Sequence, residues 1–135
     1  MNLAHLCLER SAARLPNRAA VADCASGVTY NYRELNERVN ALANALLGMG
    51  VQRGDRVGIY LRNTPEFILA FMANAKIGAI SVPFNIMFKR AEIAYILNDS
   101  GCRVLWASAE EGGQNVLPFL GDFPKIEQLV LVGED

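Results

Sequence analysis

Residues 54–85 read GDRVGIYLRNTPEFILAFMANAKIGAISVPFN, and this stretch decides the fold. The mainly apolar run at 56–61 is typical of a buried strand. Thr64 and Pro65 predict a helix start, with Thr64 as the capping residue and Pro65 in the first helical position. Gly78 ends that helix, and a second apolar run follows it. A strand, a helix and a strand in this order predict a βαβ unit with two parallel strands.

The alternation of strands and helices continues downstream. Ser108 and Glu111 predict a capping box, and we expect the helix after it to falter at Gly112-Gly113 and resume to Leu120. Uninterrupted apolar strands suit burial on both faces of a parallel sheet. The predicted elements are strands at 56–61, 79–82, 103–107 and 127–132, with helices at 65–76, 89–97 and 109–120.

Three further elements are predicted before this region. A helix begins near Asn2 and ends at Pro16, and short strands between 19 and 30 suggest a β-hairpin. Asn31 caps a long helix whose apolar positions recur at helical spacing, at Leu35, Val39, Leu42 and Leu46. We therefore expect residues 1–135 to form a single α/β unit. It is a doubly wound parallel sheet of βαβ units, preceded by an N-terminal helix, a short β-hairpin and a long helix.

Composition excludes several classes of protein. The chain has 135 residues, 52% of them hydrophobic, and 13 Lys+Arg against 14 Asp+Glu give a net charge of −1. This content is too apolar for disorder, and without a basic run it argues against nucleic-acid binding. Three dispersed cysteines with no CxxC indicate neither a disulfide framework nor a zinc site. We expect a cytoplasmic protein.

One segment has the length of a membrane span. Residues 67–88 are mostly apolar, but Lys76 lies near their centre, and Gly78, Pro83 and Asn85 interrupt them. A central lysine costs about 2.5–3.5 kcal/mol on insertion scales. We interpret the segment as a buried helix followed by a buried strand, and expect no transmembrane segment.

Candidate site residues lie where the predicted strands end, because open α/β sheets bind ligands at the carboxyl ends of their strands. Residues 62–64, 83–85, Ser108 and 133–135 occupy these ends, and none forms a catalytic set. Asn63 and Thr64 precede a helix N-terminus that could hold an anion. Plain capping is the favoured interpretation.

Other motifs give no site either. Residues 48–54 superficially resemble a dinucleotide fingerprint, but they follow a helix and precede a strand, the reverse of the required context. His5 and Cys7 are two residues apart on a helix and do not face each other. The residues themselves therefore predict no catalytic residue and no metal ligand, and leave the cofactor-binding residues unknown.

Four motifs in order resemble those of AMP-forming acyl-CoA synthetases, in the adenylate-forming superfamily. Lys76 to Asn85 (KIGAISVPFN) is similar to the second core motif, K-x-G-A-x-x-V-P-x-N. Residues 31–35 (NYREL) resemble the first, in which Thr or Ser usually precedes Tyr; residues 54–75 and 92–105 also resemble the family. The resemblance runs from about Leu3 to Val132.

The resemblance implies an ATP-dependent carboxylate–CoA ligase that uses ATP, Mg and coenzyme A. The complete family makes an acyl-adenylate and then the CoA thioester, and the pattern at 83–85 resembles fatty-acid or aryl-acid ligases. This chain lacks the family's Pro-Lys-Gly loop, its aromatic-Gly-x-Thr-Glu and Thr-Gly-Asp motifs, and its C-terminal lysine domain. We therefore expect an N-terminal fragment, inactive alone, with no cofactor bound by this chain alone.

Two alternatives remain open: a stand-alone interaction or complementing domain, and a flavodoxin-like small-molecule-binding module. The expected partners are the remainder of a synthetase chain or a second copy of this one. Residues 129–132 (LVLV) form an apolar run that a parallel sheet would cover on both faces. Few residues follow it, so we expect an exposed apolar surface and self-association.

Overall fold

The predicted βαβ unit forms the centre of the structure. In the computed structural model, which describes residues 2–133, β3 (Arg56–Tyr60) and β4 (Ile80–Pro83) run parallel and are joined by α3 (Pro65–Ile77). Parallel strands β5 (Val104–Ser108) and β6 (Gln128–Val132) extend the sheet beyond β3, in the order β4-β3-β5-β6. The four strands predicted from the sequence are thus confirmed as one parallel sheet.

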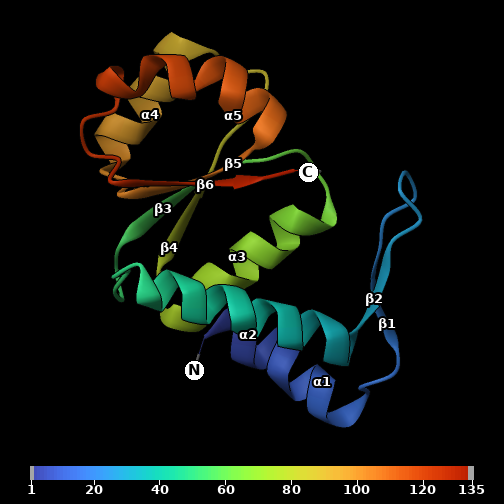
Figure 1. Cartoon of the computed structure of the whole chain (residues 1–135). Helices are drawn as coiled ribbons and strands as arrows, with labels where there is room; N and C mark the ends of the chain where they lie inside the picture. Colours follow the sequence, from blue (N-terminus) through green and yellow to red (C-terminus); the bar gives the residue numbers. More distant parts are fainter. Residues whose placement is uncertain (1, 134–135) are drawn as a thin grey trace.

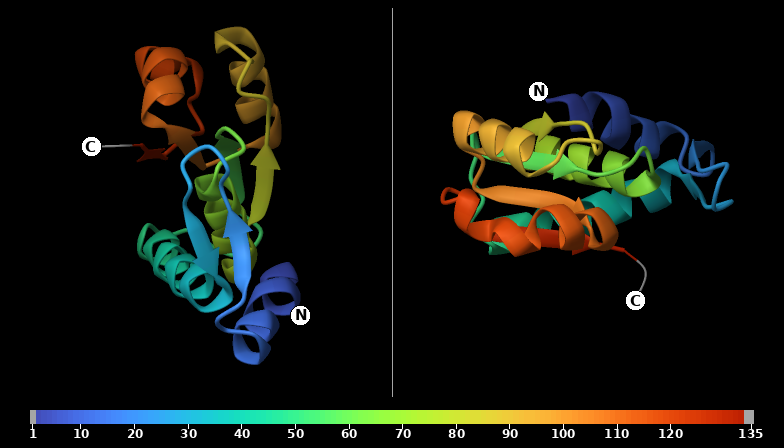
Figure 2. Two further views of the ribbon diagram at one scale, coloured as in Figure 1. Left: turned by 90° about the vertical axis from the view of Figure 1, so that its right-hand side faces the viewer. Right: turned by 90° about the horizontal axis from the view of Figure 1, so that it is seen from above.

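The remaining elements follow the predicted order. The structure adds η1 (His5–Glu9), α1 (Arg10–Arg14), β1 (Ala19–Ala22), β2 (Thr29–Asn31), α2 (Tyr32–Gly48), α4 (Arg90–Ser100), β5 (Val104–Ser108), α5 (Ala109–Asn115), η2 (Leu117–Asp122) and β6 (Gln128–Val132). The antiparallel hairpin β1–β2 lies at one end of the molecule, outside the four-stranded sheet (Figure 2).

Helices cover the two faces of the sheet (Figure 1). On one face, α2 and α3 pack against one set of strand residues, including Val57, Ile59 and Trp106. On the other face, α4, α5 and η2 cover Tyr60 and Leu105. The α/β prediction with both faces covered is confirmed.

Gly78 ends α3 in the left-handed conformation, with φ of 76°. A side chain is strained there, and a Cβ would also lie 2.9 Å from Cγ of Arg53. The carbonyl of Gly78 accepts the N–H of Gly54 at 2.9 Å, and Ala79 donates back to the Asn74 carbonyl at 2.9 Å. This turn brings the chain from α3 directly into β4.

A buried polar contact fixes α3 against the sheet. Asn74 is fully buried. Its amide nitrogen donates to Oγ of Ser81 at 3.0 Å, and its amide oxygen accepts the indole N–H of Trp106 at 3.3 Å. One side chain of α3 therefore contacts both β4 and β5, which lie on either side of β3.

A second polar cluster holds the N-terminal helices in place. The side chain of Lys76 is 9% exposed, and its Nζ lies 3.0 Å from Oε1 of Glu9 and 2.7 Å from Oδ1 of Asn36. Asn40 also accepts a hydrogen bond from Lys76. Lys76, which interrupts the apolar segment in the sequence, thus joins α3 to α2 and to η1.

The predicted caps hold in part. Asn31 forms the capping box of α2 with Glu34, with 2.9 Å hydrogen bonds in both directions. Thr64 is the N-cap residue of α3 and Pro65 takes its first helical position, as predicted, but the Thr64 side chain makes no capping hydrogen bond. The turn closes through the backbone instead, where the N–H of Phe67 donates to the Thr64 carbonyl at 3.1 Å.

The break predicted at Gly112-Gly113 is also misplaced. Both glycines lie inside α5, and the helix ends at Asn115, before η2. Pro118 near the start of η2 explains the position, since proline lacks the N–H that a continuing helix needs. Gly112 suits its place because a Cβ there would lie 2.8 Å from Cβ of Ala107. α5 therefore lies close to β5.

Among the residues described, no helix is both long enough and apolar enough to cross a bilayer. The segment at 67–88 forms α3, β4 and the loop after it.

Replacing Gly78 with valine should destabilise the protein. The strained backbone and the contact with Arg53 together predict a loss of about 1–3 kcal/mol in the free energy of unfolding, measured by urea denaturation. Gly48→Val is the matched control, since Gly48 has open space around it and its φ is not positive. Equal midpoints for the two variants would contradict the proposed strain.

Asn74→Leu should lower the free energy of unfolding by about 1–3 kcal/mol, because it leaves the buried N–H of Trp106 without an acceptor. Trp106 is the single tryptophan of the chain, so its near-ultraviolet circular dichroism should change as well. Asn44→Leu on the exposed face of α2 is the control. Unchanged stability and an unchanged tryptophan signal in Asn74→Leu would contradict the role of this contact.

Candidate functional site

The order of the strands identifies the edge where a ligand of this fold would lie. β4 pairs with one side of β3 and β5 with the other, so the connection that leaves β3 and the connection that leaves β5 run to opposite sides of the sheet. In open α/β sheets this switch point is the usual ligand crevice. Arg62 and Asn63 follow the end of β3, and Ser108 is the last residue of β5.

Side chains of the chain itself fill this switch point. Arg62 donates from Nε to Oε1 of Glu111, whose side chain is 11% exposed. Oγ of Ser108 accepts the backbone N–H of Glu111 at 2.9 Å and donates to its carboxylate. The hydrogen bonds from Ser108 and Arg62 lower the pKa of Glu111 from its ordinary value. The carboxylate is therefore held ionised and fully paired.

Tyr60 organises the neighbouring loop. Its hydroxyl lies 2.9 Å from the carbonyl oxygens of Ile86 and Phe88, and it accepts a 3.2 Å hydrogen bond from the amide of Asn115. The Tyr60 ring stacks on Phe84 with centroids 5.2 Å apart. Burial raises the pKa of the Tyr60 hydroxyl, so this phenol is a structural hydrogen-bonding group at neutral pH.

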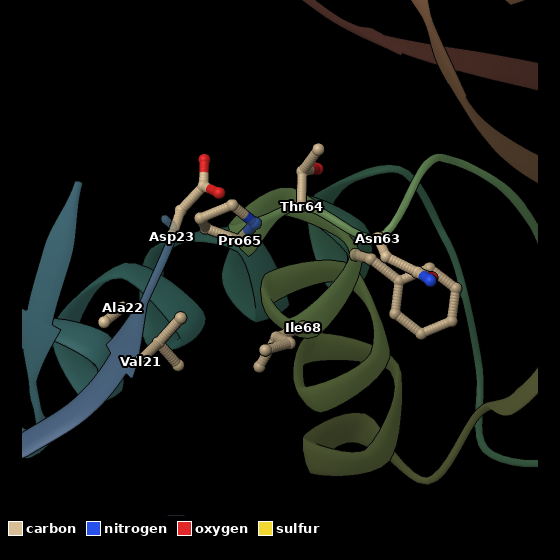
Figure 3. Close-up of a pocket in the computed structure, with 8 residues that line it drawn as sticks. Val21, Ala22, Asp23, Asn63, Thr64, Pro65 and Ile68 are labelled. Carbon is tan, nitrogen blue, oxygen red and sulfur yellow. The ribbon is translucent and has the colours of Figure 1, made fainter. Parts of the chain in front are cut away.

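A pocket of about 280 Å³ lies beside the switch point, between the hairpin and the start of α3. Figure 3 shows Val21 and Asp23 of the hairpin on one side of it, and Asn63, Thr64 and Ile68 at the start of α3 on the other. Asp23 binds the Ser26 hydroxyl, which lowers the pKa of its carboxyl group. An ionised carboxylate repels anions, so this pocket disfavours the anion site considered at Asn63 and Thr64.

The residues predicted at the strand ends lie in different places in the structure. Arg62 and Ser108 meet through Glu111, whereas Asn63 and Thr64 line the pocket. Oδ1 of Asn85 accepts the N–H of Met87 at 2.9 Å and shapes the loop. Glu134 and Asp135, also predicted to lie at a strand end, are outside the described residues.

The roles of two polar residues at the switch point were not predicted. The capping box predicted for Ser108 and Glu111 is half formed: Oγ of Ser108 accepts the N–H of Glu111 at 2.9 Å, while the Glu111 carboxylate accepts from the Ser108 hydroxyl and from Arg62. Asn115 was absent from the prediction because its contact with Tyr60 joins residues 55 apart in the chain. A buried strand that ends in tyrosine was the available signal, since a buried hydroxyl requires a partner.

The residues present do not fit Mg or a nucleotide phosphate. Among residues 2–133, no cluster of His, Cys, Asp and Glu side chains could hold a metal ion. At the switch point, the carboxylate of Glu111 and the guanidinium of Arg62 pair with each other. The arrangement positions loops and helices, and the carboxylate beside the Ser108 hydroxyl is held by Arg62.

Comparison with known proteins assigns the family. Residues 8–134 match the family described as AMP-binding enzyme. The crotonobetaine/carnitine–CoA ligase of Citrobacter koseri is 37% identical over 119 residues, which cover 87% of this chain and 23% of that protein. The corresponding ligase of an Escherichia coli O17:K52:H18 strain is 43% identical over 94 residues, or 68% of this chain and 18% of that protein.

A solved structure agrees over almost the full chain. The anthranilate CoA ligase AuaEII, solved in complex with anthranoyl-AMP, superposes with a TM-score of 0.90 at 31% identity. The match covers 98% of this chain and 25% of that protein. The chain thus spans about a quarter of the length of the proteins it matches. It belongs to the AMP-binding enzyme family.

Proposed function

We propose that this chain is the N-terminal part of an ATP-dependent, AMP-forming carboxylate–CoA ligase. The observation that carries the proposal is the superposition of 98% of the chain on a CoA ligase with a TM-score of 0.90. The relatives matched in sequence are also named as CoA ligases. In this proposal residues 1–135 act as one α/β unit of the larger enzyme.

In this proposal the unit is a structural part of the enzyme and supplies no reacting group. Complete ligases of this kind activate a carboxylate as an acyl-adenylate and pass the acyl group to coenzyme A. Adenylate chemistry needs donors and Mg²⁺ positioned against the charge on the phosphates. The motifs that supply them in the family are absent from this sequence, and the carboxylate at the switch point is paired with Arg62. The 135-residue chain is therefore inactive alone in this proposal.

The proposed substrate class is a carboxylic acid of the fatty-acid or aryl-acid type, in keeping with the resemblance of residues 83–85 to such ligases. The proposed partner is the remainder of a ligase chain, which in the matched proteins amounts to about three quarters of the length. ATP, Mg and coenzyme A belong to that complete enzyme. The proposed compartment is the cytoplasm.

A chimeric ligase tests the proposal. The aligned 119 residues of the Citrobacter koseri ligase are replaced by the matching residues of this chain. We expect the chimera to release AMP only when both a carboxylate and coenzyme A are supplied. The unaltered ligase is the positive control, and a chimera with Gly78→Val should lose folded protein and activity together. A folded chimera that forms no acyl-adenylate would refute the assignment.

The 135-residue chain is assayed separately for carboxylate-dependent ATP–pyrophosphate exchange, with background rates expected. Exchange above background in the pure chain would refute its inactivity but not its family.

A scaffold role for the switch point predicts an effect of Glu111 on stability that depends on pH. Glu111→Gln should lower the free energy of unfolding by about 1 kcal/mol at pH 7, because Ser108 and Arg62 lose a charged acceptor and Arg62 is largely solvated. The folded pKa of Glu111 lies below its ordinary value of 4.5. The stabilisation is therefore complete above that value and is lost as the pH falls toward the folded pKa.

The measurement is denaturation of the wild type and the variant from pH 7 to pH 3. Their difference should shrink with falling pH. Glu110→Gln is the control, since that side chain is 70% exposed and lies 3.9 Å from Arg62. If the difference in the free energy of unfolding stays constant over this pH range, the ionised carboxylate of Glu111 does not stabilise the fold.

A further inference from the structure

One buried hydroxyl joins three segments at the carboxyl edge of the sheet. Tyr60 is the last residue of β3 and is fully buried. Its Oη lies 2.9 Å from the carbonyl oxygens of Ile86 and Phe88, in the loop between β4 and α4. A phenol has one proton to donate, so the two carbonyls share it. The amide of Asn115, the last residue of α5, donates to the same oxygen at 3.2 Å. The loop is therefore held in position from inside the molecule.

The side chains of this loop alternate between the inside and the outside. Three of them pack against the core on the face covered by α4, namely those of Phe84, Ile86 and Phe88. Asn85 and Met87 point outward, and the side chain of Met87 is 70% exposed. Oδ1 of Asn85 accepts the N–H of Met87 at 2.9 Å, and the carbonyl of Asn85 accepts the N–H of Phe88 at 3.0 Å. These hydrogen bonds close the loop into a tight turn.

Met87 lies at the tip of this turn, between the two carbonyls that Tyr60 holds. A single exposed apolar side chain is ordinary on a protein surface. The backbone of Met87 is unusual because its own N–H and the carbonyls of the residues on both sides of it are all bound. The turn thus fixes where the side chain starts, while the thioether itself remains flexible. Such a side chain suits contact with an apolar or aromatic group.

The turn also lies where a ligand of this fold is expected. It follows Pro83, the last residue of β4, which pairs with Ile59 beside the end of β3. Open α/β sheets bind their ligands outside the carboxyl ends of the strands. The outward side of the turn therefore borders the region in which a substrate would lie.

We propose that Met87 contacts an apolar or aromatic group of a substrate in the complete ligase, and that Tyr60 is the positioning residue that holds Met87 there. The inference rests on the proposed function, because the reaction needs the complete enzyme. Two kinds of substrate group have this chemistry. One is the hydrocarbon chain or ring of the carboxylic acid, and the other is the adenine that ATP and coenzyme A each carry.

The first test measures the KM of each substrate in the chimeric ligase, with the other two substrates saturating. Tyr60→Phe keeps the ring that stacks on Phe84 and removes only the hydroxyl. We expect the KM of one substrate to rise about three- to tenfold, the range of one net hydrogen bond. The value of kcat should stay within about twofold, because the lost contact weakens substrate and transition state alike. A rise for the acid identifies its apolar part, and a rise for ATP or coenzyme A identifies adenine.

Tyr95→Phe is the matched control for this substitution. It makes the same chemical change on α4, where the side chain of Tyr95 is 71% exposed. All three KM values should stay as they are in the unaltered chimera.

The second test changes the proposed contact itself. Met87→Ser should raise the same KM as Tyr60→Phe, whereas Met87→Leu should leave it near that of the unaltered chimera, because leucine remains apolar. The double variant with Tyr60→Phe and Met87→Ser should show little more than the larger single effect. Two substitutions that remove one shared contact are not additive.

The third test follows the turn in the 135-residue chain and needs no activity. Tyr60→Phe should speed the hydrogen exchange of the Met87 and Phe88 amides, which the turn protects, and leave the amides of β3 unchanged. Tyr95→Phe should change neither group.

The outcomes separate this inference from the proposed function. An inactive chimera without any of these substitutions would refute the proposed function, and the exchange measurement would still decide the role of Tyr60. In an active chimera, KM values that ignore both Tyr60→Phe and Met87→Ser would overturn the inference. Equal rises of all three KM values would do the same, since they indicate a general change in the fold. Unchanged exchange at Met87 and Phe88 would exclude Tyr60 as the positioning residue.

Discussion

Burial of β3 and β5 on both faces is the constraint on which the rest of the structure depends. Val57 and Ile59 on one face, and Tyr60 and Leu105 on the other, are fully buried. Neither face can be left to water, so helices must lie on both sides. After β3 the chain crosses one face of the sheet as α3 and must enter β4 in the correct register. Gly78, which ends α3, sets where β4 begins, and Asn74 of α3 holds the helix to both β4 and β5.

The sequence predicts the strands well because their pattern is strong and local. All four parallel strands lie within a residue or two of their expected positions, since each is a short apolar run bounded by turn residues. The end of α3 was equally accessible, because a glycine after an apolar helix predicts a left-handed stop. These features depend on residues that are close together in the chain, so they can be recognised from the sequence alone.

Contacts between side chains that are far apart in the chain could not be predicted from the sequence. The hydroxyl of Thr64 makes no capping hydrogen bond, and Glu111 binds Arg62, 49 residues earlier, in addition to Ser108 at the start of its own helix. Strand order was also hidden, since nothing in the apolar runs states which side of β3 each one takes. The switch point therefore emerged only in three dimensions, as did the way in which its charges pair. The resemblance to the family, by contrast, could be recognised from the sequence, because it rests on the order of motifs along the chain.

The strand order also bears on how the sheet is made during translation. β4 pairs with β3, β5 with β3, and β6 with β5, so every strand after β3 joins one that precedes it in the chain. Domains form from the N-terminus as the ribosome releases about 5–20 residues per second. Each strand of this sheet thus emerges to find its neighbour already synthesised, and none has to insert between two strands that are already paired. The sheet can therefore grow outward from β3 at the pace of synthesis, first on one side through β4 and then on the other through β5 and β6.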